Sequence, residues 1–182
     1  MSQDKYNRVA IVLHWVLAVA LIAQFVFGLW MEDIPKDPPG VRAFWFNLHK
    51  SVGLVIGLLV LWRMGWRITH SVPPDLPDTP LWQAKLAQLT HGLMYLVMLL
   101  IPVTGFLGSS FSQYPVKFFG FALPRLWEAD PEMKEQLSEL HEGTSWILAG
   151  LLAIHLLAVV WHVAFKRDGL LQRMSLRHTG HQ

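Results

Sequence analysis

Three long windows without any charged residue constrain this chain more than any other feature of its sequence. Residues 9–31, 86–112 and 143–165 contain no Asp, Glu, Lys or Arg. Each window exceeds the roughly 20 residues that an α-helix needs to cross a hydrocarbon core about 30 Å thick. The sequence therefore excludes a soluble globular protein and predicts helices that cross a membrane.

Composition excludes several other classes. Charged residues make up 15% of the 182 residues, below the roughly 25% of soluble domains. The apolar windows exclude a disordered chain, and the net charge of +2 is too small for the basic stripe of a nucleic-acid binder. Because the sequence has no Cys, disulfides, Cys-ligated iron–sulfur clusters and covalent haem attachment are excluded as well.

We interpret the chain as one membrane domain over residues 1–182, with spans at about 9–31, 47–66, 85–110 and 141–165 and a basic cytoplasmic tail at 166–182. The first span is expected to be retained, because it is too long for the apolar core of a signal peptide. The second span is the least clear, since its charge-free core covers only residues 51–62. Lys50 and Arg63 flank that core and can extend to the membrane surface; a buried helix of the soluble type is the alternative.

The segments between the spans carry turn and interface signals. The Pro-rich residues 32–44 and 69–83 are expected to be loops, and the aromatic residues 112–130 are expected to lie at the membrane interface. Asp130 followed by Pro131 favours a helix start, because Asp caps helix N-termini and Pro suits the first turn. The last helix is thus expected to begin at Pro131 and to continue through the fourth span. Pro102 and Gly105 suggest a kink in the third.

The distribution of Lys and Arg predicts the orientation, because cytoplasmic segments collect basic residues. One side of the predicted bundle carries nine of these residues: Lys5, Arg8, Arg63, Arg67, Lys85, Lys166, Arg167, Arg173 and Arg177. The other side carries six: Lys36, Arg42, Lys50, Lys117, Arg125 and Lys134. Both termini are therefore predicted to be cytoplasmic in a protein that crosses the membrane several times.

Histidine is the residue type that points to chemistry. Six of the nine His lie in the spans or at their edges, where an ionisable side chain is costly and indicates function: His14, His49, His91, His141, His155 and His162. A single membrane His often serves as an interhelical hydrogen bond or a proton relay. Six of them in four helices favour metal binding.

Helix geometry places the histidines at two depths. His141 and His155 lie 14 residues apart, which corresponds to roughly 21 Å of rise and about 40° of rotation, so they share one helix face. His49 opens the second span level with His141, and His14 could reach His155 across the bundle. His91 and His162 match the depth of His14 slightly better than His155 does, so this second pairing is open.

An iron porphyrin suits such pairs, because it takes one axial nitrogen from each side and buries its ring between helices. Gly53, Gly57 and Gly150 would leave room for a ring, although close helix packing explains Gly53 and Gly57 equally well. Zinc and di-iron chemistry are disfavoured, since the span interiors lack carboxylates. The predicted fold is an all-α integral membrane protein, a four-transmembrane-helix bundle enclosing two b-type haems.

The sequence resembles the bacterial cytochrome b561 family of di-haem inner-membrane cytochromes, because it contains short motifs of that family in the same order along the chain. They cover nearly the whole chain: Tyr6-Asn7-Arg8, Ile11-Val12-Leu13-His14-Trp15, Asn47-Leu48-His49-Lys50-Ser51-Val52-Gly53, His91-Gly92-Leu93-Met94-Tyr95, Pro102-Val103-Thr104-Gly105, His141-Glu142, His155, and His162 with Lys166-Arg167-Asp168-Gly169. The resemblance implies that His14 and His155 hold one haem b iron on the cytoplasmic side. It also implies that His49 and His141 hold the other on the periplasmic side.

Within the family, the sequence is most similar to the superoxide oxidase type. This resemblance implies oxidation of superoxide at the periplasmic side and reduction of ubiquinone, with no catalytic residues beyond the haems. Lys50, Arg42 and Lys117 are the cations expected to attract superoxide. Three residues expected near the cytoplasmic haem are the candidates for binding the quinone: His162, Trp15 and His91.

Two other interpretations use the same sequence. The first is an electron-transfer subunit that links a partner dehydrogenase or hydrogenase to the quinone pool; the short periplasmic loops argue against it, and we predict no obligatory protein partner. The second is a haem-free transporter or proton-relay protein, which would be colourless. In every case membrane lipid surrounds the chain.

Overall fold

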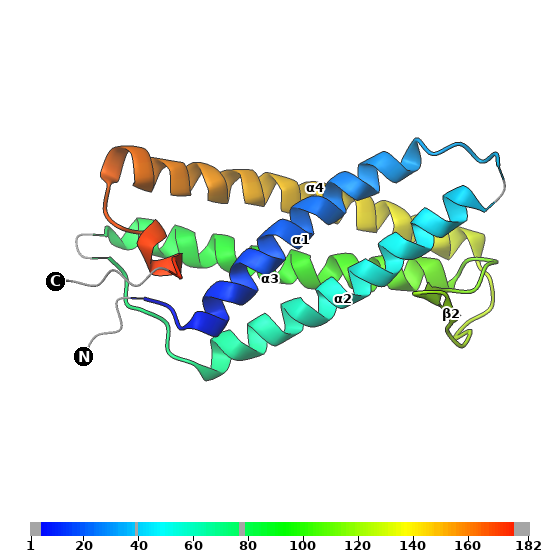
Figure 1. Cartoon of the computed structure of the whole chain (residues 1–182), viewed down its shortest axis with the longest axis horizontal. Coiled ribbons are helices and arrows are strands. Elements are labelled where there is room, and N and C mark those ends of the chain that lie inside the picture. The colour runs from blue at the N-terminus through cyan, green and yellow to red at the C-terminus, as the bar shows by residue number, and fades with distance from the viewer. Residues whose placement is uncertain (1–4, 39, 77–78, 177–182) are drawn as a thin grey trace.

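Four long helices form the protein in a computed structural model that describes residues 5–38, 40–76 and 79–176. Their bounds are α1 Arg8–Glu32, α2 Val41–Thr69, α3 Leu81–Ser110 and α4 Pro131–Trp161, and a wider π-helical turn, η1 (His162–Lys166), extends α4. Figure 1 shows them as one elongated bundle in which the start of α1 and the end of α4 lie at the same end. All four are long and apolar enough to cross a membrane, which confirms the predicted four-helix membrane bundle.

Capping residues fix where two of the helices begin. The side chain of Asn7 accepts a hydrogen bond from the Ala10 amide at 2.8 Å and caps α1. Asp130 accepts bonds from the amides of Glu132 and Met133, each at 3.0 Å, and Pro131 is the first residue of α4. The predicted start of the last helix is thereby confirmed.

Helices α2 and α3 begin earlier than the sequence predicts. Residues 41–44 and 81–83, placed in loops above, are helical, so this part of the loop prediction was wrong. The neighbouring prolines and charged residues suggested loops there, whereas the hydrogen-bonded backbone of a helix continues past single charged residues such as Arg42 and Lys85. Helix α3 also continues past Pro102, whose ring lies 3.1 Å from where a Cβ on Gly57 would stand. Gly57 therefore serves close packing of α2 against α3.

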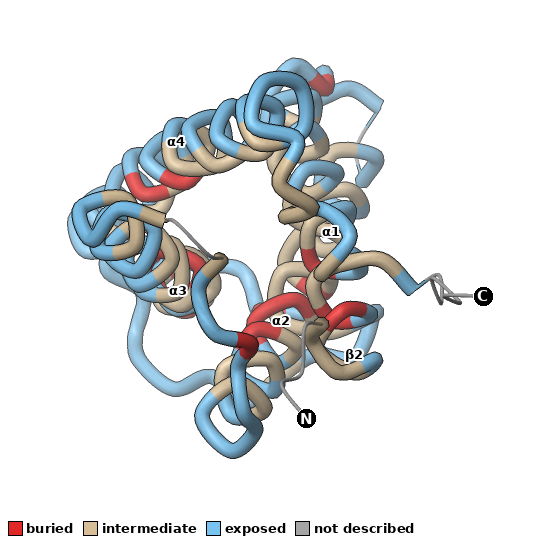
Figure 2. Tube along the Cα trace, turned by 90° about the vertical axis from the view of Figure 1, so that its left-hand side faces the viewer, coloured by how far each residue is buried: buried red, intermediate tan, exposed pale blue. Residues whose placement is uncertain are grey.

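The apolar core sits midway along the bundle. It consists of buried side chains from all four helices, namely Leu17, Ile56, Val60, Val97, Met98 and Leu148. Figure 2, which looks along the bundle, shows exposed backbone on the outside and intermediate or buried residues toward the middle. The outward apolar side chains suit contact with lipid.

A short hairpin closes one end of the bundle. Strands β1 (Lys117–Phe118) and β2 (Phe121–Ala122) pair antiparallel, and Phe119 and Gly120 between them both have positive φ. The buried hydroxyl of Ser51 accepts a hydrogen bond from the Phe119 amide at 2.9 Å and donates to the Asn47 carbonyl at 2.7 Å. This contact attaches the hairpin to α2 within the segment that the sequence placed at the interface.

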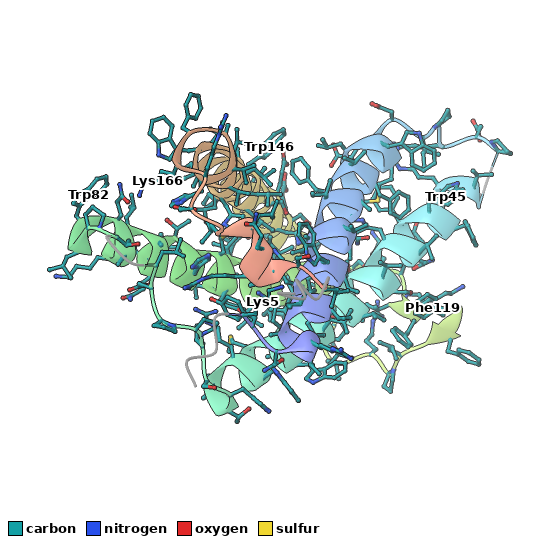
Figure 3. All side chains as sticks on the ribbon, turned by 60° about the vertical axis from the view of Figure 1, so that its left-hand side comes forward. Lys5, Trp45, Trp82, Phe119, Trp146 and Lys166 are labelled. Carbon is teal, nitrogen blue, oxygen red and sulfur yellow. The ribbon has the colours of Figure 1, made fainter. Side chains whose placement is uncertain are left out.

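A strap, residues 167–176, folds back over the other end. It contains the short helix η2 (Leu171–Met174) and reaches the start of α1, where the Tyr6 amide donates to the Arg173 carbonyl at 3.3 Å. Figure 3 shows it lying across the start of α1, beside Lys5. The rest of the predicted basic tail, with Arg177, His178 and His181, lies outside the described residues.

Candidate functional site

Two groups of histidines lie at opposite ends of the apolar core. The hairpin-end pair is His49 of α2 and His141 of α4, whose ring centroids are 6.3 Å apart. At the other end, the ring of His14 in α1 lies 6.2 Å from that of His155 in α4. Sequence spacing predicted this two-level arrangement, and the folded chain brings both pairs together across the bundle.

The spacing of each pair suits one metal ion between two imidazoles. Two ring nitrogens that bind one ion from opposite sides, each at about 2.0 Å, place their ring centroids about 6 Å apart. The planes of the hairpin-end rings are inclined at 82° and those of His14 and His155 at 66°. Both pairs therefore fit two axial ligands of an iron porphyrin.

Hydrogen bonding orients the hairpin-end pair. The Nδ1 atom of His141 lies 2.8 Å from the carbonyl oxygen of Ile101. Because a carbonyl only accepts hydrogen bonds, Nδ1 carries the proton, and Nε2 is left to bind a metal. Among the described residues, the buried Nδ1 of His49 has no hydrogen-bond partner, and such an orphaned atom is typical of a site that receives a further group.

Two glycines make room for these imidazole rings. A Cβ on Gly105 would stand 2.8 Å from Nδ1 of His141, and one on Gly28 would stand 3.3 Å from Cε1 of His49. The sequence interpretation missed both positions and selected others. Of the glycines it selected, Gly150 has open space where a Cβ would stand. The motif that ends in Gly105 was visible in the sequence, but its steric role was not.

The hairpin-end pair lines a cavity of about 810 Å³, within the range of roughly 300–1,000 Å³ that is usual for ligand sites. Lys50 lines it, as expected for a cation near this pair, and so does Lys134, which the sequence interpretation did not select. Glu32, Glu135, Glu139 and Glu142 also line the cavity, so carboxylates outnumber ammonium groups in its lining.

The other two predicted cations lie elsewhere. The Lys117 side chain is exposed on β1. The Arg42 guanidinium donates to the carbonyls of Glu32 at 3.0 Å and Ile34 at 2.6 Å. It also lies 4.9 Å from the centre of the Phe46 ring. Arg42 thus holds the loop that links α1 to α2, and Lys50 is the predicted cation that lines the cavity.

A third histidine belongs to the other end. The ring of His91 in α3 lies 5.6 Å from that of His155, so His14, His91 and His155 form a strap-end cluster. Arg63 donates to the Ala10 carbonyl at 2.9 Å and approaches Nδ1 of His14 at 3.2 Å. The structure thus places His14 and His91 beside His155, with the Arg63 guanidinium against His14. His162, the other histidine that sequence depth left open, contacts Asp168 instead.

His162 and Trp15, the other predicted quinone residues, both contact the strap. Nδ1 of His162 lies 2.5 Å from a carboxylate oxygen of Asp168. The Trp15 indole donates to the Met174 carbonyl at 2.9 Å. Partial desolvation acts to raise the pKa of Asp168, but hydrogen bonds from His162 and the Leu170 amide outweigh it and leave that pKa below its usual value.

A comparison with known families agrees with this geometry, since the sequence pattern described as prokaryotic cytochrome b561 matches residues 5–175. The chain belongs to this family. A cytochrome b561 is a four-helix, haem-binding membrane bundle that transfers electrons, and the paired histidines described above suit that role. As a member of the family, the chain is a multi-pass protein of a bacterial inner membrane.

Individual relatives of this cytochrome b561 are distant but match over nearly the full length. It is 25% identical to "Cytochrome b561 homolog 2" of Escherichia coli (strain K12), over 95% of this chain and 92% of the relative. It is 30% identical to "Cytochrome b562" of Cereibacter sphaeroides, over 96% and 98%. A "Probable superoxide oxidase CybB" of Yersinia pestis is 25% identical over 97% and 98%.

Proposed function

We propose that this cytochrome holds two haem b groups, one between His49 and His141 and one between His14 and His155. The ring separations of 6.3 Å and 6.2 Å support both pairs. The Ile101 carbonyl fixes the ring of His141, and Gly28 and Gly105 leave the rings their space. When bound, haem b supplies a one-electron iron couple.

We further propose that the protein oxidises superoxide at the hairpin end and reduces ubiquinone at the strap end. Two superoxide anions lose one electron each and leave as oxygen, and one ubiquinone takes up the two electrons with two protons. The observation that carries this proposal is the cavity of about 810 Å³ that joins the hairpin-end pair to Lys50 and Lys134. Lys50 and Lys134 are the groups proposed to attract a small anion, against the carboxylates of Glu32, Glu135, Glu139 and Glu142 in the same lining. The relative named a probable superoxide oxidase supports the same substrate.

The proposed quinone site lies between the strap and the strap-end cluster. His162, whose side chain is 20% exposed, supplies a hydrogen-bond donor. The indole N–H of Trp15 is already bonded to Met174, so we assign the Trp15 ring to the apolar wall of the site. His91, next to His155, completes the predicted set.

The proposed orientation places the hairpin end in the periplasm and both termini in the cytoplasm. In support, the start of α1 and the end of α4 share one end of the bundle (Figure 1), and the Lys and Arg count favours that end as the cytoplasmic one. Electrons then move inward through the bundle, and the protons for ubiquinone come from the cytoplasm.

Stopped-flow spectroscopy of the purified protein tests this function. A superoxide pulse should reduce two haems per chain within milliseconds, and excess ubiquinone should reoxidise them. Haem that superoxide leaves oxidised, but that ubiquinol reduces, would instead identify a subunit that awaits another electron donor. A haem-loaded protein with one haem per chain would contradict the two-site assignment.

Charge variants test the entry of superoxide. We expect Lys50→Gln and Lys134→Gln each to slow haem reduction by superoxide about threefold at low salt, and the loss should shrink as salt screens the charges. Lys36→Gln is the matched control, because Lys36 is exposed in the loop after α1 and does not line the cavity. Equal rates for all three variants would contradict the proposed steering.

A further inference from the structure

The contact between His162 and Asp168 is built by an unusual helix end. The Arg167 amide donates to the His162 carbonyl at 2.7 Å, which closes a wide turn, and Arg167 then adopts a left-handed conformation with φ of 51°. Such a residue reverses the chain direction at a helix end, although glycine is the usual choice there. As a result the Asp168 carboxylate returns to the His162 ring and meets Nδ1 at 2.5 Å.

The carboxylate is fixed on both of its oxygens. One oxygen accepts from Nδ1 of His162, and the other accepts from the Leu170 amide at 3.2 Å. The side chains of His162 and Asp168 are 20% and 23% exposed, so both are largely sheltered from water. A carboxylate held in this way accepts from one ring nitrogen and so keeps one imidazole tautomer.

The strap that carries Asp168 is attached to other parts of the molecule. The Trp15 indole donates to the Met174 carbonyl at 2.9 Å, and Arg173 donates to the Pro74 carbonyl at 2.5 Å. The position of Asp168 therefore depends on α1 and on the 71–76 loop as well as on α4. This anchoring distinguishes the pair from an ion pair on a freely moving tail.

We propose that Asp168 is a positioning residue for protonation of the quinone, because it holds the proton on Nδ1 of His162 and leaves Nε2 to face the quinone oxygen. This inference rests on the proposed function, in which ubiquinone is reduced beside His162. Each ubiquinone accepts two electrons and two protons. His162 gives a proton from Nε2 to a quinone oxygen and recovers one from cytoplasmic water. Asp168 stays ionised throughout.

The surroundings of the pair agree with this division of roles. The charged groups that act on the Asp168 carboxylate are His162 and Lys166, and the Lys166 amine donates to Gln83 of α3 at 3.1 Å. The strap contacts α1 through Trp15 and the 71–76 loop through Pro74, neither of which titrates. The lowered pKa of Asp168 keeps it ionised at neutral pH, so that His162 is the group of the pair that exchanges protons.

Asp168→Asn tests the inference, because it keeps the shape and an acceptor oxygen but removes the charge. The haem-loaded protein is reduced with limiting dithionite and mixed with a short-chain ubiquinone, so superoxide is not involved. We expect reoxidation near pH 7.5 to slow roughly 100-fold, the lower end of the range for loss of acid–base assistance.

Three comparisons make the outcome decisive. Asp168→Glu, which restores the charge, should recover most of the rate. Asp75→Asn, an exposed residue at the same end, is the matched control and should behave as the wild type. A wild-type rate in Asp168→Asn would overturn the inference and leave the proposed function standing, whereas failure of ubiquinone to reoxidise the wild-type haems would overturn both.

Discussion

Replacing Gly105 by Ala tests how closely the hairpin-end site is fitted to His141. The new Cβ would stand 2.8 Å from Nδ1 of His141, where ordinary contact begins at 3.4 Å, and 2.9 Å from Cε1. The ring must therefore move about 0.6 Å to reach ordinary contact, which a tightly packed interior resists. That shift is comparable to the roughly 0.5 Å within which site residues must be held, and it pulls Nδ1 away from the Ile101 carbonyl.

The expected loss follows from these two effects. Weakening a hydrogen bond of this kind costs about 1 kcal/mol, and disturbing the partner that orients a metal-bound histidine lowers metal affinity about 10- to 100-fold. Ala itself favours the helix by about 1 kcal/mol over Gly. The helix should thus be retained while the site is damaged.

Haem content and redox titration measure this loss. With limiting haem, Gly105→Ala should fall from two haems per chain toward one, and one of the two reduction potentials should disappear. Gly92→Ala is the matched control, because it lies on the same helix and its Cβ would enter open space. Two haems with unshifted potentials in Gly105→Ala would refute this reasoning about the fit of the ring.

Three further predictions concern the two ends of the bundle. Ser51→Ala leaves the Phe119 amide without its acceptor and should destabilise the hairpin by about 1–3 kcal/mol. Amide hydrogen exchange of residues 117–122 should therefore become faster. Unchanged protection of these amides would contradict the prediction. Asp130→Ala removes the cap of α4 and should cost about 1 kcal/mol, which faster amide exchange at residues 132–134 would reveal. The pKa of Asp168 is lower in the folded protein than its ordinary value of 3.8. The stability that the ionised carboxylate gives to the folded protein is therefore complete above that value and is lost as the pH falls through the folded pKa. Protease cleavage of the strap should therefore increase below about pH 4, and Asp168→Asn should abolish this pH dependence.

Features that depend on a helix and its apolar face could be predicted from the sequence. The three long charge-free windows indicate α1, α3 and α4, the shorter charge-free core at residues 51–62 indicates α2, and Asp130 with Pro131 indicates where α4 begins. The positions of His141 and His155 on one face follow from the helical repeat alone. Such features are local, so sequence spacing is sufficient to describe them.

Contacts between elements could not be predicted in the same way. The Ile101 carbonyl that receives His141 is a backbone atom, and no residue type indicates which carbonyl has that role. The contact of Asp168 with His162 needs a left-handed Arg167, and the hairpin needs a positive φ at Phe119. Neither residue type favours that conformation, so tertiary contacts prevail over local preference at both positions.

The two histidine groups on α4 have a consequence for the energy of the membrane. His141 and His155 are separated by roughly 21 Å along the helix, most of an apolar core about 30 Å thick. Under the proposed orientation, each electron that passes between them carries negative charge inward through the membrane potential, and moving one charge across the full potential is worth about 2.3 kcal/mol per 100 mV. Turnover would then be electrogenic and would add to the voltage across the membrane.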